Sequence, residues 1–269
     1  GRNQRGAGPG DQGAYGRPLR GPGPGSVSSG SQSEVLLSAL LEECELLFRK
    51  GQSPTDRPER LATTRRASEL VDELGRERLR WERSPRLKGA PDAAEPASAP
   101  PGLRHFRSAA ESLREDRFAS ERFPRLLEET LSLFAWSSFY RRDFWSASFL
   151  DEIAALKLLG PAAPAPSERL ALGLFLMGPG VHYPLHAHAA EELYLTIGGA
   201  IDFRSDPKQP WRTTVPGDLI YHRVHEPHEM RTRERASVAL YLWSGEIFEP
   251  SWYKGNMETP EEPPKYPEM

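Results

Sequence analysis

The sequence of 269 residues is long enough for one sizeable domain with an accessory region, and its 23 glycines and 26 prolines indicate that part of it does not pack. Its formal net charge of −3 gives no sign of a nucleic-acid or anionic-membrane partner. The one cysteine, Cys44, excludes an internal disulfide and a cysteine-based metal cluster.

Residues 1–33 form the first segment, which contains Gly, Pro, Ser, Gln and Arg but almost no large apolar side chain. Such a segment cannot bury enough surface to fold, so we predict a disordered tail. The alternative is the remnant of an arginine-rich targeting segment, which would indicate an organelle. Otherwise the single cysteine, with no recognisable signal peptide or membrane-span pattern, leads us to expect a cytoplasmic protein.

Residues 34–160 are predicted to form a helical region. Two amphipathic stretches, from Ser33 to Gly51 and from Pro58 to Trp81, carry apolar faces with helix-start signals. A Pro/Ala-rich loop is predicted over residues 84–103, and helical spacing returns at 105–135. Seven aromatic residues then lie between Phe134 and Phe149. We interpret them as a surface on which the helices dock, with a wall of the active site as the alternative.

A β pattern over residues 165–250 predicts a barrel. Short apolar or alternating runs occupy 169–177, 193–197, 200–203, 218–223 and 237–243, and Gly, Pro and Asp separate them. Several short strands at such close spacing are typical of an all-β sandwich or barrel. Residues 251–269 are predicted to be a Pro-rich C-terminal tail. The chain has no Gly-rich phosphate loop, so we expect no nucleotide cofactor.

Side chains with ligand chemistry share one face of the chain near residue 190. His186, His188, Glu192 and Tyr194 are spaced by even numbers, so on extended chain they point the same way. His228 follows a turn and a short strand, which allows the chain to return and add another nitrogen. Imidazole and carboxylate ligands together suit one divalent transition metal (Fe, Zn, Mn, Ni or Co) at an open site.

Three further histidines lie near this group. His182 and His222 have the parity to face the same cavity, where we expect them at the rim or behind the ligands. His225 competes with His228 as a ligand. We favour His228 because the strand pattern resumes there.

The ligand spacing resembles the first motif of the cupin superfamily, as Gly180-x5-His186-x-His188-x3-Glu192-x6-Gly199. Pro216-Gly217 and His228 resemble the second motif, although the usual Pro-x-Gly is contracted. The resemblance implies a mainly β fold, a cupin double-stranded β-helix barrel preceded by an α-helical N-terminal region. It also implies a metal inside the barrel mouth.

The residues around these motifs, from about Leu170 to Gly245, resemble the cupin-type dimethylsulfoniopropionate (DMSP) lyases. The resemblance rests on Tyr183-Pro-x-His186, Glu192-x-Tyr194, Trp211, Pro216-Gly217-Asp218, His228-x-Met230-Arg231-Thr232 and Leu240-Tyr-Leu-Trp243-x-Gly245. It implies a carbon–sulfur lyase that splits DMSP into dimethyl sulfide and acrylate by β-elimination. Tyr194 would be the base and a further candidate ligand, while Tyr183 would position the substrate or assist proton transfer. A packing role is the alternative for each tyrosine.

A small sulfonium zwitterion is therefore the expected partner, and aromatic faces attract such cations. Trp243, Tyr221 and Tyr241 are the candidate contacts, with strand packing as the alternative for each. Exposed aromatics in the helical half would allow a homodimer. Two other functions stay open, namely a metal-dependent cupin dioxygenase, which would require oxygen, and a cupin that binds a small ligand without catalysis.

Overall fold

The structure is a computed structural model that describes residues 29–52, 65–84, 99–138, 140, 145–249 and 251–253. Residues 1–28 of the predicted tail, residues 85–98 of the Pro/Ala-rich loop and the C-terminal segment after 253 lie outside these ranges. The predicted start of the second helix, within residues 53–64, also lies outside them.

The helices of the described chain precede the sheets, as the sequence predicts. They are α1 (Ser29–Gln52), α2 (Arg65–Arg83), the 3-10 helix η1 (Pro101–His105), α3 (Phe106–Asp116), α4 (Phe123–Leu133) and α5 (Ala147–Leu150). Helices α3 and α4 fall within 105–135, where helical spacing returns. Helix α1 begins before the Ser33 start that we predicted. Among the described helices, none combines the length and apolarity that a membrane span requires.

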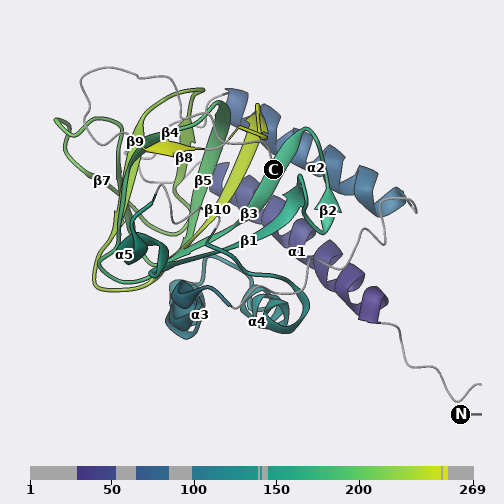
Figure 1. Ribbon diagram of the computed structural model, residues 1–269. Coiled ribbons are helices and arrows are strands. Elements are labelled where there is room, and N and C mark those ends of the chain that lie inside the picture. The colour runs from purple at the N-terminus through teal and green to yellow at the C-terminus, as the bar shows by residue number, and fades with distance from the viewer. Residues whose placement is uncertain are drawn as a thin grey trace, which may run out of the picture.

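The strands form two sheets that face each other (Figure 1). The six-stranded sheet has the order β2-β1-β3-β10-β5-β8, with β1 (Ile153–Gly160), β2 (Ala165–Pro166), β3 (Leu170–Met177), β5 (Ala190–Gly198), β8 (Leu219–His222) and β10 (Ser237–Gly245). The five-stranded sheet has the order β11-β4-β9-β6-β7, with β4 (His182–Ala187), β6 (Ile201–Arg204), β7 (Arg212–Thr214), β9 (His228–Thr232) and β11 (Trp252–Tyr253).

Two apolar layers hold these elements together. One lies between the helices and the six-stranded sheet, where residues such as Leu40 of α1 and Leu193 of β5 are buried. The other lies between the two sheets and contains Tyr194 of β5 and Phe203 of β6. Because side chains alternate along a strand, β5 sends Leu193 to the helices and Tyr194 to the second sheet. This alternation decides which side chains reach the interior between the sheets.

Cys44 lies in the helical layer, within α1. The side chain is completely buried and belongs to the same apolar cluster as the leucines of that helix. Burial, with a smaller contribution from Glu43, raises the pKa of the Cys44 thiol far above its usual value.

Strand β1 lies inside the segment 34–160 that we predicted as helical, and this part of the prediction is wrong. Its sequence, IAALKLLG, is rich in Ala and Leu, which favour helices as single residues. The strand pairs with β3 from Ile153↔Met177 to Leu159↔Leu172 and is buried on both faces. Tertiary pairing and burial on both faces therefore override the local propensity.

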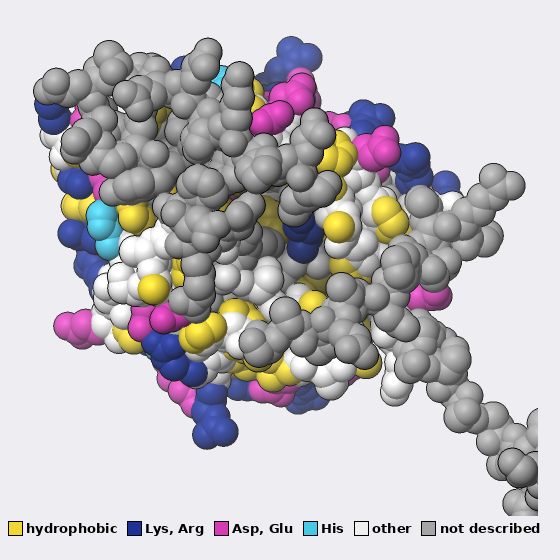
Figure 2. All heavy atoms as spheres, in the orientation of Figure 1, with side chains coloured by type: hydrophobic (Ala, Val, Ile, Leu, Met, Phe, Trp, Pro, Cys, Tyr) yellow, Lys and Arg dark blue, Asp and Glu magenta, His cyan; other side chains and the backbone are white. Residues whose placement is uncertain are grey.

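The architecture confirms a mainly β cupin fold preceded by a helical region. The two sheets are those of a double-stranded β-helix, but within the described residues no strand pairing joins them into a closed barrel. On the face shown in Figure 2, the described acidic and basic side chains are interspersed, in keeping with the small net charge.

Candidate metal centre and active site

Strands β4, β5 and β9 bring the four predicted metal ligands together. The register of β4 and β9 pairs His186 with His228, while His188 follows β4 and Glu192 lies near the start of β5. One ring nitrogen from each histidine lies within 4.8 Å of those of the other two. Glu192 Oε2 lies 3.0 Å from His188 Nε2 and 3.3 Å from His228 Nε2. All four side chains are buried.

Backbone carbonyls fix how the three imidazoles present their nitrogens. The Nδ1 atoms of His186, His188 and His228 each lie 2.8–2.9 Å from the carbonyl oxygen of a residue two positions away. A carbonyl only accepts hydrogen bonds, so each Nδ1 carries a proton, and Nε2 is the atom of each ring that is left to bind a metal. Three such nitrogens beside a carboxylate form a donor set that fits one divalent transition metal.

The protonation of the site suits a metal. Burial, together with His228 and His188, holds the pKa of His186 well below its usual range, so the ring is in the neutral form that binds metals. Burial opposes ionisation of Glu192, but His188 and His228 outweigh it and hold the pKa of this carboxyl well below its usual range. At neutral pH His186 therefore offers a neutral imidazole and Glu192 a carboxylate.

Trp243 orients the carboxylate. Strand β10 pairs Trp243 with Glu192 of β5, and the indole Nε1–H donates to Glu192 Oε1 at 2.5 Å. The Trp243 ring also lies against His188, with 4.4 Å between the ring centroids. We predicted that Trp243 contacts the substrate. The structure shows that its indole N–H is hydrogen-bonded to Glu192.

An irregularity in β4 places Tyr183 beside the ligands. The pairing with β9 shifts between Tyr183 and His186, so both face the interior although their spacing is odd. The Tyr183 ring stacks on His186 with 3.9 Å between centroids, and its hydroxyl is hydrogen-bonded to that of Tyr140. The same shift turns His182 outward, where it is exposed and bonded to Glu229 at 2.7 Å. The inward parity that we predicted for His182 is therefore wrong.

Tyr194 and Tyr241 also face the interior between the sheets. The register of β5 and β10 pairs them, and both are buried. The Tyr194 ring centroid lies 6.4 Å from that of His228. Burial raises the pKa of both phenols well above the usual value, and the charge of Glu192 adds to this effect.

His222 and His225 differ sharply in position. His222 is paired with Glu192 across β5 and β8, faces the interior as its parity predicts, and stacks on His228 with 3.9 Å between centroids. His225 is exposed in the loop before β9, and only His228 belongs to the nitrogen cluster. The position of His228 supports the ligand that we favoured.

Tyr221 lies on the opposite face of the sheet, so its predicted place in the site is wrong. It pairs with Leu193, whose side chain points to the helices, and it packs against the helical core. Its hydroxyl donates to Glu191 at 2.5 Å. Arg66 of α2 donates to the same carboxylate, with its Nε 3.0 Å from Oε1 and 2.9 Å from Oε2. Strand parity alone separates Tyr221 from the inward-facing His222.

The described members of the aromatic cluster divide between the helical layer and the interior between the sheets. Phe134 and Trp136 pack in the helical layer. Tyr140, Trp145 and Phe149 instead join the interior cluster around Tyr183 and reach the ligand side. We did not single out Tyr140 from the sequence. Its position among the aromatic residues between Phe134 and Phe149 was the only sequence feature that could have indicated its place beside Tyr183.

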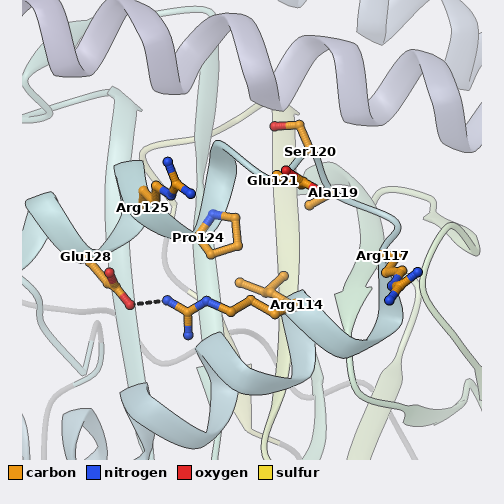
Figure 3. A pocket seen from close by; sticks show the side chains of 9 residues that line it. Arg114, Arg117, Ala119, Ser120, Glu121, Pro124, Arg125 and Glu128 are labelled. Carbon is orange, nitrogen blue, oxygen red and sulfur yellow. Dashed lines mark hydrogen bonds and ion pairs between the residues drawn. The ribbon is translucent and has the colours of Figure 1, made fainter.

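A separate hollow of about 750 Å³ lies between α3 and α4 (Figure 3). Arg114 and Glu128 form an ion pair on its wall, and Arg117 and Arg125 also line it. None of the predicted ligands or tyrosines lines this hollow.

Comparisons with known proteins agree with this geometry. The family model described as dimethylsulfoniopropionate lyase matches residues 75–239. Dimethylsulfoniopropionate lyase DddQ of Ruegeria pomeroyi is 36% identical over 112 residues, which cover 42% of this chain and 55% of that one, so the match spans about half of that relative. DddL of Cereibacter sphaeroides, whose lyase name is provisional, is 28% identical over 208 residues, covering 77% of this chain and 81% of that one.

A solved structure supports the fold. A crystal structure reported for the DMSP lyases RdDddP and RnDddQII matches with a TM-score of 0.57 at 21% identity, over 82% of this chain and 99% of that one.

Proposed function

Because this chain belongs to the dimethylsulfoniopropionate lyase family, we propose that it is a metal-dependent carbon–sulfur lyase that cleaves DMSP to dimethyl sulfide and acrylate. The observation that carries the proposal is the buried group of three imidazole Nε2 atoms and one carboxylate, with the tyrosine Tyr194 facing the same interior. The ligands in this proposal are His186, His188, Glu192 and His228.

In the proposed reaction, Tyr194 removes a proton from the carbon next to the substrate carboxylate. The electron pair of that C–H bond forms the double bond of acrylate. The C–S bond breaks, and sulfur leaves with the bonding pair as neutral dimethyl sulfide, so one proton is released overall. A bound metal would supply positive charge that stabilises the substrate carboxylate and favours the phenolate form of Tyr194.

Burial also affects whether Tyr194 can act as a base. It raises the pKa of Tyr194, so without a nearby cation the phenol stays protonated at neutral pH and cannot act as a base. Activity should therefore depend on the ligands even though Tyr194 receives the proton. Tyr194 and the four proposed ligands are buried, and low exposure to water strengthens the electrostatic interactions among them.

The sulfonium end of the substrate requires a different surface. The rings of Tyr140, Tyr183 and Tyr241 border the interior and offer π faces to a cation. Within this surface Tyr183 contacts Tyr140 on one side and stacks on His186 on the other, so it is suited to position the substrate between the two ends of the site.

The test is anaerobic release of dimethyl sulfide from purified protein and DMSP, measured in the headspace with Fe(II), Mn(II), Zn(II), Ni(II) or Co(II). Tyr194→Phe should abolish metal-dependent release, because it removes the proton acceptor. Tyr221→Phe is the matched control, because its ring faces the helices. Absence of gas with every metal would sink the lyase proposal. Oxygen uptake with substrate consumption would then favour a cupin dioxygenase, and ligand binding without turnover a non-catalytic cupin.

A further inference from the structure

A buried imidazole beside the proposed metal ligands has no hydrogen-bond partner among the residues that the structure describes. His222 is 2% exposed, and neither Nδ1 nor Nε2 has a partner among the described residues. Buried polar groups in proteins are nearly always hydrogen-bonded, and one left unpaired costs free energy. A partner that binds in the site would remove this cost.

His222 occupies a defined place in a row of rings. Tyr183 stacks on His186, and His222 stacks on His228, at 3.9 Å between centroids and 7° and 10° between planes. His186 and His228 meet edge to face at 4.1 Å. The two stacking rings therefore flank His186 and His228, with Tyr140, Trp145 and Phe149 around Tyr183 on one side and His222 on the other.

Several other polar groups of the centre already have hydrogen-bond partners. The imidazoles of the three ligands each use Nδ1 on a carbonyl, and the Glu192 carboxylate accepts from Trp243 and faces His188. An imidazole carries at least one N–H in either protonation state. His222 is therefore a donor near Tyr194, whose ring centroid lies 6.2 Å from its own.

We propose that His222 binds the carboxylate end of the substrate, donating a ring N–H to a carboxylate oxygen. This proposal rests on the proposed function, because it requires a ligand with a carboxylate group to enter this site. The sulfonium would then lie toward the Tyr183 side and the carboxylate toward His222. The carbon that loses its proton is next to that carboxylate, which brings it to the side where Tyr194 lies.

The experiment measures propionate binding to the full chain loaded with Zn(II), by calorimetry, beside steady-state kinetics with DMSP. His222→Phe keeps a ring that can stack on His228 but removes the donor, and His222→Gln restores an N–H. His182→Phe is the matched control, because His182 is exposed and turned away from the interior. Zn(II) affinity of each variant is measured in parallel by competition with a chelating dye.

Because the lost hydrogen bond is to a charged group, we expect His222→Phe to weaken propionate binding roughly 10- to 100-fold. The substitution should also raise the KM for DMSP more than it lowers kcat. Zn(II) affinity should stay within about threefold, and His222→Gln should recover part of the propionate affinity. Unchanged propionate affinity, a loss of Zn(II) affinity, or no propionate binding by the unmodified protein would each overturn the proposal. If propionate binding responds as expected but no dimethyl sulfide forms, the lyase assignment fails while the carboxylate site stands.

Discussion

The hydrogen bond from Trp243 to Glu192 gives the most direct test of how the protein prepares its metal ligands. The indole N–H donates to Glu192 Oε1, while Oε2 faces His188 and His228. Trp243→Phe would remove this donor but keep an aromatic ring where the indole lies against His188. The carboxylate would then be free to rotate away from the orientation that binds the metal.

The magnitude follows from the type of bond. The acceptor is a buried carboxylate, so the hydrogen bond is charge-assisted and contributes about 1.5–3 kcal/mol. If this contribution is expressed in metal binding, the affinity should fall roughly 10- to 100-fold, which is also the range found when groups that orient metal ligands are lost.

The assay is Zn(II) affinity of the purified full chain at pH 7.5, measured by competition with a chelating dye. Trp211→Phe provides the control, because Trp211 lies between Arg204 and Arg231 and not at the ligands. A Trp243→Phe protein with unchanged Zn(II) affinity would refute the reasoning. It would mean that the strand register alone fixes the orientation of Glu192.

Three other outcomes are expected. Tyr194→Phe should lose dimethyl sulfide release while Zn(II) affinity changes less than about tenfold, and a larger loss of metal would identify Tyr194 as a ligand. Arg66→Gln should lower the free energy of unfolding by about 1 kcal/mol, because it breaks a partly exposed ion pair between α2 and β5. Arg65→Gln, at an exposed pair on the same helix, should have no measurable effect in the same urea titration. The free energy of unfolding of metal-free protein should fall as pH is lowered from 7.5 to 5.5. His186 and His222 have pKa values well below 6.5 when folded, so the unfolded chain takes up protons that the folded chain excludes. Stability that stayed level or rose over this range would contradict the burial of neutral rings.

The ligand set could be predicted because its information is local. Even spacing places His186, His188 and Glu192 on one face of the chain, and His228 follows at the start of a later strand. The structure gathers these four side chains. Which strands are neighbours cannot be derived from spacing, so the contact from Trp243 to Glu192 was not foreseen. It depends on the register of β10 with β5.

The errors have physical causes of two kinds. The irregularity in β4 breaks the alternation that we assumed, so Tyr183 faces inward and His182 outward. Tyr221 was chosen for its aromatic ring although the parity of β8 favours its neighbour, His222. In β1, the helical propensity of Ala and Leu was overridden by pairing with β3, which no local pattern reports.

Because Cys44 is buried, its chemical reactivity can report how often the helical layer opens. Cys44 is the only cysteine of the chain, its side chain has no exposed surface, and its thiol resists ionisation. A thiol reagent can react only when the packing around Cys44 opens, so the rate of labelling under native conditions measures how often the helical layer opens. Because the same protein can be labelled with and without metal, the labelling rate reports whether metal binding slows the opening of the helical layer.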